Sequence, residues 1–175
     1  MPIIELHVPG LREMHFRQEW LADPETMAYN RGRDMGGAEG FHPDTGCIDF
    51  PVENWRWWRQ AWLNNAPDFY SAYVQDVDTG KFVGEVCWFY DGENKTHTAG
   101  ILIAAKHRDR GYCAPALKAL ADRAFEYAEI ASLQTEIPGD NLPALRGYAR
   151  AGFHDFGGDG MSAMILTRED WERNL

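Results

Sequence analysis

A nearly unbroken apolar run at residues 98–105 (TAGILIAA) constrains the fold of this chain more than any other segment. Such a run is typical of a strand that is covered on both faces of a sheet. β-Rich runs precede it at 70–76 and 81–90, separated by the hairpin signal Asp78-Thr79-Gly80. After it, the spacing of apolar residues becomes helical. We therefore expect the run to lie inside a mixed sheet, between hairpin strands and α/β units.

The segments after this run predict alternating helices and strands. Two helices are expected, over residues 114–130 and 141–151. Strands are expected at 133–137, 153–156 and 161–167, the last two joined by a glycine-rich turn at 157–160. Together with the hairpin, this order predicts one α/β domain over residues 1–175 with a mixed central sheet.

The N-terminal part of the chain predicts helices and one irregular stretch. Short helices are expected at 11–21 and 23–29, the second opened by an Asp-Pro pair. Five glycines then interrupt residues 30–51. This stretch is interpreted either as a substrate-binding loop or as a plain connector between elements.

Four of the seven tryptophans of the chain lie close together. Trp55, Trp58 and Trp62 recur at helical spacing, which favours a helix that packs onto the sheet through them. In the alternative interpretation the cluster is an aromatic wall for a ligand, and Trp57 on the opposite helix face is its most accessible member.

The charge balance restricts the classes of partner. Seventeen Lys and Arg stand against 27 Asp and Glu, for a formal net charge of −10. Binding to nucleic acid or to an anionic membrane needs a net basic face, so neither partner is expected. The net negative charge is compatible with a cationic partner.

The cysteines and the N-terminus indicate a cytoplasmic protein. Cys47, Cys87 and Cys113 lie far apart with no CxxC pair, so no metal site and no disulfide framework are expected. The first 16 residues contain charged residues and a proline where a signal peptide needs an unbroken apolar stretch. No apolar run is long enough to span a membrane.

The loop after the apolar run carries the chemistry. Residues 106–113 (KHRDRGYC) lead into a helix, and a loop of free backbone N–H groups at a helix start binds anions such as phosphate. Gly111 removes a side chain that would keep the ligand at a distance. Residues 106–123 hold five Lys and Arg against two Asp, which reverses the sign of the whole chain. The alternative is a solvated basic turn. Neither GxxxxGK[ST] nor a helix-opening GxGxxG is present.

Two motifs resemble one enzyme superfamily. Arg108-x-x-Gly111-x-Cys113-Ala114, after an apolar strand, resembles the coenzyme A pyrophosphate loop of the GNAT acetyltransferases, although glycine or alanine is usual at the position of Cys113. Asn141-x-x-Ala144-x-x-x-Tyr148-x-x-x-Gly152-Phe153 is similar to their second block. The resemblance covers residues 81–156 and is closest to the ribosomal-protein N-terminal acetyltransferase type. It implies a mixed, mostly antiparallel central sheet flanked by helices.

The resemblance also implies an acetyl-CoA site and no metal. The backbone of Ile101 and Ile103 would lie along the pantetheine. Asn141, Ala144 and Tyr148 would line the other side of the cofactor. The pyrophosphate would be bound by the main chain of Arg108, Asp109, Arg110, Gly111, Tyr112, Cys113 and Ala114.

Acetyl transfer to an amine needs a base and an acid. Glu136 lies where related N-terminal acetyltransferases carry a glutamate proposed as the base, whereas Glu85, a polar residue in an apolar strand, is a rival and His97 a weaker third choice. Tyr148 is the candidate acid, because a phenol with a pKa near 10 keeps its proton at neutral pH. Core packing is the alternative role for Tyr148.

These residues predict an N-acetyltransferase that moves an acetyl group from acetyl-CoA directly to a primary amine of a small molecule or peptide. A non-catalytic acyl-CoA-binding regulatory module is the alternative, and a structural α/β interaction domain is a third. The negative charge outside the cofactor loop favours a cationic acceptor. The protein is expected to be a monomer or a homodimer.

Overall fold

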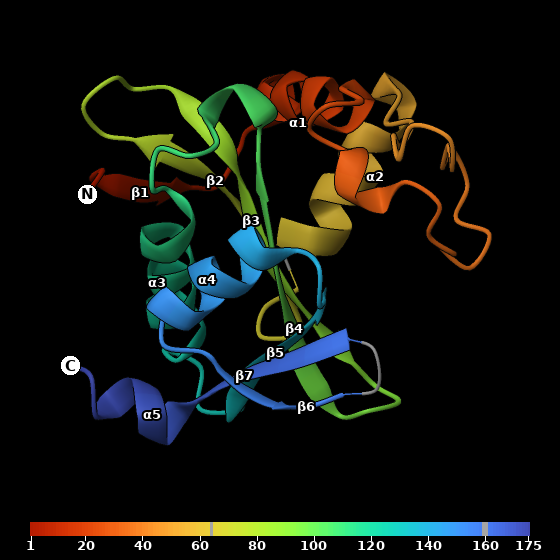
Figure 1. Ribbon diagram of the computed structural model, residues 1–175. Coiled ribbons are helices and arrows are strands. Elements are labelled where there is room, and N and C mark those ends of the chain that lie inside the picture. Colours follow the sequence, from red (N-terminus) through yellow and green to blue (C-terminus); the bar gives the residue numbers. More distant parts are fainter. Residues whose placement is uncertain (64, 159–160) are drawn as a thin grey trace.

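A seven-stranded sheet organises the chain, and the computed structural model describes residues 1–63, 65–158 and 161–175. Its strand order is β1-β2-β3-β4-β5-β7-β6 (Figure 1). All neighbouring strands are antiparallel except β4 and β5. The strands are β1 (Ile4–His7), β2 (Phe69–Asp76), β3 (Phe82–Asp91), β4 (Thr96–Ile103), β5 (Ser132–Pro138), β6 (His154–Gly157) and β7 (Met161–Thr167).

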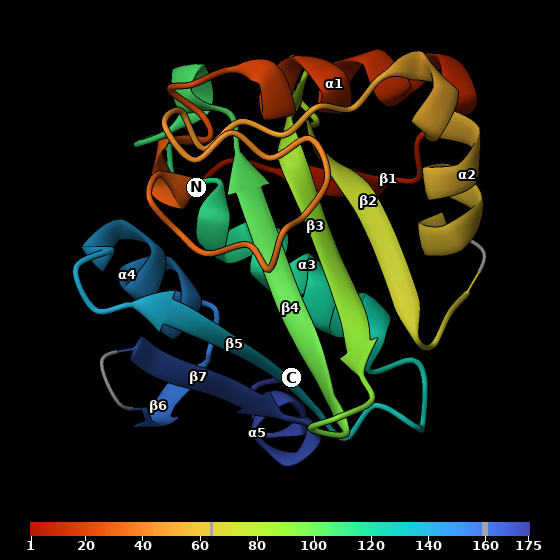
Figure 2. The same ribbon diagram turned by 90° about the vertical axis from the view of Figure 1, so that its right-hand side faces the viewer.

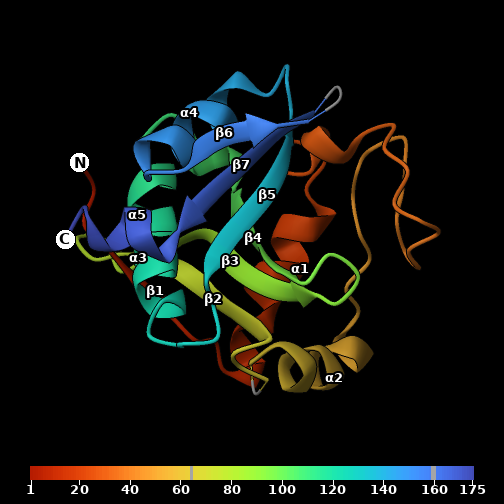
Figure 3. The same ribbon diagram turned by 90° about the horizontal axis from the view of Figure 1, so that it is seen from below.

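Helices cover both faces of this sheet (Figures 1 and 2). Figure 3 shows α3 and α4 on one side, with α1 and the irregular segment 31–51 on the other. In the described ranges, no helix has both the length and the apolar character to cross a bilayer. The helices are η1 (Leu11–Glu13), α1 (Met14–Ala22), η2 (Ala28–Asn30), α2 (Val52–Leu63), η3 (Ala105–His107), α3 (Cys113–Ala124), α4 (Leu142–Arg150) and α5 (Arg168–Glu172).

Strand β4 separates two hydrophobic cores, as its apolar sequence predicts. Ala99, Ile101 and Ile103 pack into the core beneath α3 and α4. Leu102 and Ala104 belong to the second core, beneath α1 and α2. Because side chains alternate along a strand, β4 needs apolar residues at successive positions to serve both cores.

The pairing of β4 with β5 ends after two residue pairs, His97↔Leu133 and Thr98↔Gln134. Beyond these pairs the two strands diverge (Figure 2). β4 stays paired with β3 as far as Ile103, and β5 stays paired with β7 along its whole length. We call this break in the pairing between β4 and β5 the opening; on either side of it, each strand is held only by its other neighbour.

The structure corrects the predictions for the N-terminal elements. β1 was not predicted, although Ile4 and Leu6 alternate with polar residues; it pairs with β2 at the edge of the sheet, and these two side chains pack against the first core. The helix expected at 23–29 is instead a turn followed by η2. The carboxylate of Asp23 closes the turn by accepting the amides of Glu25 and Thr26, each at 3.2 Å. An Asx-type turn thus replaces the expected helix.

The predicted helix 114–130 is shorter in the structure, and the terminal helix α5 was not predicted. α3 ends at Ala124. The Arg168 side chain, at the start of α5, donates hydrogen bonds to the carbonyl oxygens of Phe125, Tyr127 and Ile130 at 2.6–3.0 Å. These contacts hold the backbone after Ala124 out of the helix, and they come from a residue about 40 positions away in sequence.

The other predicted elements are confirmed. Both hairpin strands, β5, α4, β6 and β7 lie within a few residues of their expected bounds. Asn141 caps α4 through its side chain, which accepts the amide of Ala144 at 3.3 Å. The segment 31–51 is irregular apart from one β-bridge, Phe41↔Ile48. Of the turn expected at 157–160, positions 159 and 160 lie outside the described residues.

The tryptophan pattern of α2 also behaves as predicted. Trp58 is buried in the second core, and Trp55 and Trp62 pack against it. Trp57, on the opposite helix face, is 67% exposed. The helix is therefore held by one aromatic face.

Close packing of α3 against α4 depends on a glycine. A Cβ added to Gly147 would collide with Sγ of Cys113 and lie 3.1 Å from its Cβ. Cys113, which replaces the small residue usual in the motif, thus has its side chain towards α4. Burial raises the pKa of its thiol to about 11.

We expect Gly147→Ala to lower the free energy of unfolding by about 1–3 kcal/mol because it overpacks this contact. Alanine is the better helix former by about 1 kcal/mol, so a loss would come from tertiary contact. Urea unfolding measures the change. Cys113→Ala, which removes Sγ, should recover part of the loss in the double variant. Strictly additive effects would contradict this packing.

Candidate functional site

The loop between β4 and α3 has the backbone shape of an anion-binding site. Asp109 and Gly111 adopt the left-handed conformation, with φ of 59° and 82°. A Cβ added to Gly111 would meet only Cδ of Pro2, at 3.6 Å. Gly111 is therefore required by its backbone conformation, while the space beside it stays open to a ligand.

The amides of residues 109–114 have no hydrogen-bond acceptor among the residues that the structure describes. Before them, the Arg108 amide donates to Ala105 at 3.1 Å, and after them the Ala116 amide donates to Tyr112 at 3.1 Å. Six successive N–H donors, the last two in the first turn of α3, are thus available to a ligand. Free N–H groups and the positive end of a helix dipole bind phosphate groups.

The side chains of this loop anchor it to the protein. Tyr112 is buried, and its hydroxyl donates to the carboxylate of Asp76 at 2.5 Å. Cys113 packs on α4, as described above. Arg108 donates to three backbone carbonyls on its inner side. Within this loop, Lys106, Asp109 and Arg110 are exposed and form no side-chain hydrogen bond to the described part of the chain. The inward side chains of Tyr112 and Cys113 therefore leave the main chain at the start of α3 accessible.

Tyr148 lies where β4 and β5 begin to diverge. Its side chain comes from α4, is 3% exposed, and donates a hydrogen bond to the carbonyl of Ala99 at 3.3 Å. Ala99 follows Thr98, the last β4 residue that pairs with β5. Burial raises the pKa of Tyr148 above its usual value, so the phenol keeps its proton at neutral pH.

The remaining predicted cofactor residues surround the same opening. Ile101 and Ile103 lie on the part of β4 that has no partner in β5. Ala144 packs against the first core from α4, and Asn141 caps that helix with its side chain. The structure thus brings together both predicted sequence blocks, one on each side of the opening.

Glu85 forms a buried ion pair with Arg17. Nε of Arg17 lies 3.2 Å from Oε2 of Glu85, and the carboxylate side chain is 12% exposed. The guanidinium carbon also lies 4.2 Å from the ring centroid of Trp58 and 4.8 Å from that of Phe50. Burial raises the pKa of Glu85, and the Arg17 charge opposes that shift. One cation thus joins α1, α2 and β3 around this carboxylate.

The other two base candidates have different surroundings. Glu136 is exposed on β5, opposite Ala163 of β7, with no ion pair in the described ranges. Its neighbour Ile137 points into the first core, so the Glu136 side chain lies on the opposite face of the sheet. His97 is 7% exposed and lies on the paired part of β4 against Tyr90, away from the opening.

Two residues near the opening were missed from the sequence. Arg17 follows Met14 by three positions, so it lies on the apolar side of its helix, and a charged residue there is a signal of a buried ion pair. Tyr29 lies in η2, and burial together with Glu85 and Cys87 raises the pKa of its hydroxyl. No spacing pattern marks Tyr29.

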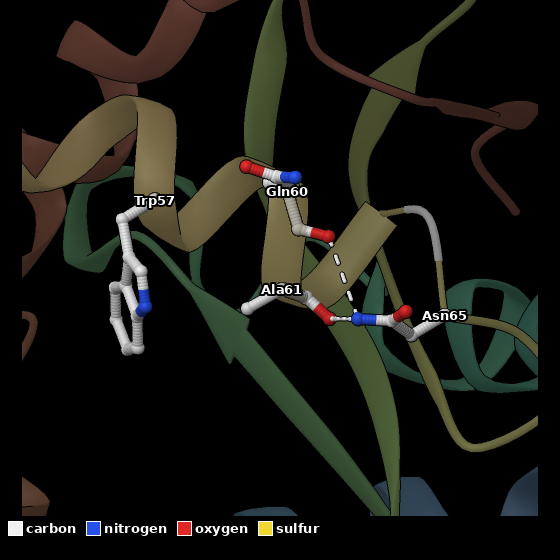
Figure 4. Close-up of a pocket in the computed structure, with 4 residues that line it drawn as sticks. All are labelled: Trp57, Gln60, Ala61 and Asn65. Atoms are coloured by element: carbon white, nitrogen blue, oxygen red, sulfur yellow. Dashed lines mark hydrogen bonds between the residues drawn. The ribbon is translucent and has the colours of Figure 1, made fainter.

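Two surface hollows lie away from this opening. One is formed by the outer side of α2, where Figure 4 shows Trp57, Gln60 and Ala61 on the helix and Asn65 beyond its end. The Asn65 side-chain amide donates to the carbonyl of Ala61 at 2.6 Å. The other lies between α1, the β2–β3 turn and η3. The first includes Trp57 of the alternative ligand-wall interpretation, and the second includes Lys106 and His107 from the loop predicted to bind an anion. Neither includes a residue predicted to bind coenzyme A or to act as acid or base. In the part of the chain that is described, no group of three acidic, His or Cys side chains is placed to bind a metal.

Comparison with known proteins gives a consistent result. The acetyltransferase (GNAT) domain profile matches residues 10–154. The structure of spermidine N-acetyltransferase from Vibrio cholerae with CoA and spermine has a TM-score of 0.72 at 13% identity, covering 97% of this chain and 98% of that chain. AAC(6')-Ib with ribostamycin and coenzyme A has a TM-score of 0.69 at 18% identity, covering 97% and 96%. No curated protein sequence matches.

We expect Arg17→Met to lower the free energy of unfolding by roughly 3–5 kcal/mol near pH 7, because Glu85 would be left buried and unpaired. Loss of Arg17 lets burial raise the pKa of Glu85 further, so the folded variant binds a proton more readily than the unfolded chain does. Its deficit should therefore shrink as the pH falls through that raised pKa.

Urea unfolding at pH 7 and pH 5 measures this effect. Arg12→Met, which removes an exposed charge near the same helix, is the matched control and should change little at either pH. In a Glu85→Gln background, Arg17→Met should cost less. A deficit that is the same at both pH values would contradict the pairing.

Proposed function

The chain belongs to the GNAT acetyltransferase family, whose members use acetyl-CoA, and we propose that it acetylates a primary amine of a small cationic acceptor. The observation that carries the proposal is the row of free amides at 109–114 beside the diverging strands β4 and β5. An amine-bearing peptide is the second acceptor class that such a site admits.

The residues present fit coenzyme A. The amides of 109–114 would hold its diphosphate, and the free edge of β4 at Ile101 and Ile103 would hold its pantetheine arm by main-chain hydrogen bonds. Acetyl-CoA supplies an acyl carbon that is already activated as a thioester. Gly111 and the inward side chains of Tyr112 and Cys113 leave the approach to these amides clear.

The charge on the other face of the sheet supports a cationic acceptor. Glu136 lies on the face of the sheet opposite to α3 and has no ion pair among the described residues, whereas Glu85 on the same face is paired with Arg17. The segment 31–51 holds four acidic residues against two arginines. Complexes of the two compared enzymes contain spermine and ribostamycin, which are amine-bearing molecules. A polyamine or an aminoglycoside-like amine is therefore the acceptor that we propose.

The amine must lose a proton before it attacks. An ammonium with a pKa near 10.4 is neutral only about once in ~2,500 molecules at pH 7, which costs roughly 4–5 kcal/mol. Glu136, exposed and unpaired among the described residues, is the proposed base, acting directly or through water. Glu85 is neutralised by its ion pair with Arg17, so it is the weaker base.

Tyr148 is the proposed acid. Its buried phenol keeps a proton at the base of the opening, and its raised pKa prevents early ionisation. The Tyr148 hydroxyl donates to the carbonyl oxygen of Ala99 over an O···O distance of 3.3 Å. This hydrogen bond is long and can be replaced by one to the departing sulfur. The two sequence blocks would also hold the thioester and the amine in reacting geometry, which supplies the rest of the rate increase.

The function is tested by the release of free thiol from acetyl-CoA. The acceptor panel contains spermine, ribostamycin, a peptide with a free α-amine and a lysine-containing peptide with a blocked terminus. We expect thiol release and an acetylated product with the polyamine or the aminoglycoside. Stabilisation by CoA without any thiol would instead indicate a binding module. If CoA neither stabilises the protein nor releases thiol, the chain is a structural domain.

We expect Tyr148→Phe to lower kcat by about 10²–10⁴-fold with little change in the KM for acetyl-CoA, because only proton transfer is removed. Steady-state kinetics with the best acceptor measures both constants. Loss of the hydrogen bond to Ala99 should lower the free energy of unfolding by only about 1 kcal/mol. A kcat within about twofold of the unsubstituted enzyme would rule out the acid role.

A further inference from the structure

The side chain of Arg108 joins two parts of the molecule that bind different substrates in the proposed function. Its Nη2 donates to the carbonyl of Thr26 at 2.6 Å and its Nη1 to that of Glu25 at 3.2 Å. Its Nε donates to Ile103 at 3.2 Å. The guanidinium is therefore shared between the end of β4 and a turn more than 80 positions away in sequence.

Thr26 completes this connection from the other side. Its side chain is fully buried, with 0% exposure. Its hydroxyl accepts the amide of Ala105 at 2.9 Å and donates to the carboxylate of Asp23 at 2.5 Å. Two independent sets of hydrogen bonds thus tie the turn 23–27 to the residues that lead into the phosphate-binding loop.

The same turn supports the irregular segment 31–51. A Cβ on Gly46 would collide with the carbonyl oxygen of Met27 and lie 3.1 Å from the amide of Arg31, so Gly46 is pressed directly against the turn. The amide of Gly32 donates to Pro43 at 2.9 Å, which closes the segment on itself. The position of this segment therefore depends on the position of the turn.

Tyr29 follows the turn in η2 and is 41% exposed. The guanidinium carbon of Arg33, in the segment 31–51, lies 5.9 Å from the centroid of its ring. The connected path runs from the amides at 109–114, through Arg108, to the turn, to Tyr29 and to the segment 31–51.

We propose that Arg108 is a positioning residue whose side chain couples the phosphate-binding loop to the acceptor side, so that cofactor binding orders the segment 31–51 and Tyr29. This inference rests on the proposed function. Each of the three guanidinium nitrogens of Arg108 already donates one hydrogen bond to a backbone carbonyl, which directs the side chain towards the turn 23–27 and the end of β4. The Arg108 amide is also occupied, because it donates to the carbonyl of Ala105 at 3.1 Å, so the row of free amides begins at Asp109 and not at Arg108 as predicted.

Arg108→Lys separates the two roles, because it keeps the charge and loses the planar arrangement of donors. We expect the KM for the acceptor to rise about 10-fold or more, as when a charge-assisted hydrogen bond is lost, and the Kd for CoA to change less than about threefold. Thr26→Val, which removes the second set of hydrogen bonds at nearly constant volume, should act in the same direction. Lys118→Ala, an exposed charge on α3, is the matched control.

Hydrogen exchange gives a readout that does not need turnover. In the unsubstituted protein, saturating CoA should slow exchange of the backbone amides in 31–51. In Arg108→Lys, at equal CoA occupancy, that protection should be lost while protection of 109–114 persists. Urea unfolding of each variant shows whether global stability has changed.

Two results would overturn the inference. One is a rise in the Kd for CoA with an unchanged KM for the acceptor, which would make the side chain a phosphate ligand. The other is CoA binding that leaves 31–51 unprotected in the unsubstituted protein. Failure of the proposed function is distinguishable from both, because it would appear as no binding of CoA or no thiol release from the unsubstituted protein.

Discussion

The separation of β4 from β5 is the constraint on which the rest of the structure depends. Two parallel residue pairs hold the strands together, and beyond them each strand is paired only on its far side. A strand with an unpaired edge inside a protein needs other partners for its N–H and C=O groups. A ligand with an amide-containing arm can supply them, which is why we propose that such an arm binds at the opening. Tyr148 stands at the point where the opening begins.

The loop that follows β4 shows how a main chain is kept free for a ligand. Tyr112 and Cys113 are turned inwards, to Asp76 and towards Gly147. Arg108 is turned towards the acceptor-side turn. Since these side chains fix the loop from beneath, its amides need not form a helix or a strand to hold their positions. Rigid donors that lack partners lose little conformational entropy when an anion binds.

The sequence was sufficient where a local pattern decided the structure. The apolar run of β4 and the motif at 108–114 place the first block of the site, and the cap at Asn141 places the second. The two blocks meet in the structure. It was insufficient where distant residues decide. Arg168 contacts the backbone that follows α3, and Arg17 neutralises Glu85. The roles of Glu136 and Tyr148 stay predictions, because their chemistry is set by substrates.

The central claim is that the backbone amides of 109–114 bind a diphosphate. The most direct measurement is a titration of isotope-labelled protein with CoA, and separately with pantetheine, followed through the NMR resonance of each backbone amide. We predict large shifts at Gly111, Tyr112 and Cys113 with CoA, and much smaller ones with pantetheine, which has no diphosphate. Loop resonances that stay in place while CoA shifts signals elsewhere, or no response to CoA at millimolar concentration, would contradict the account.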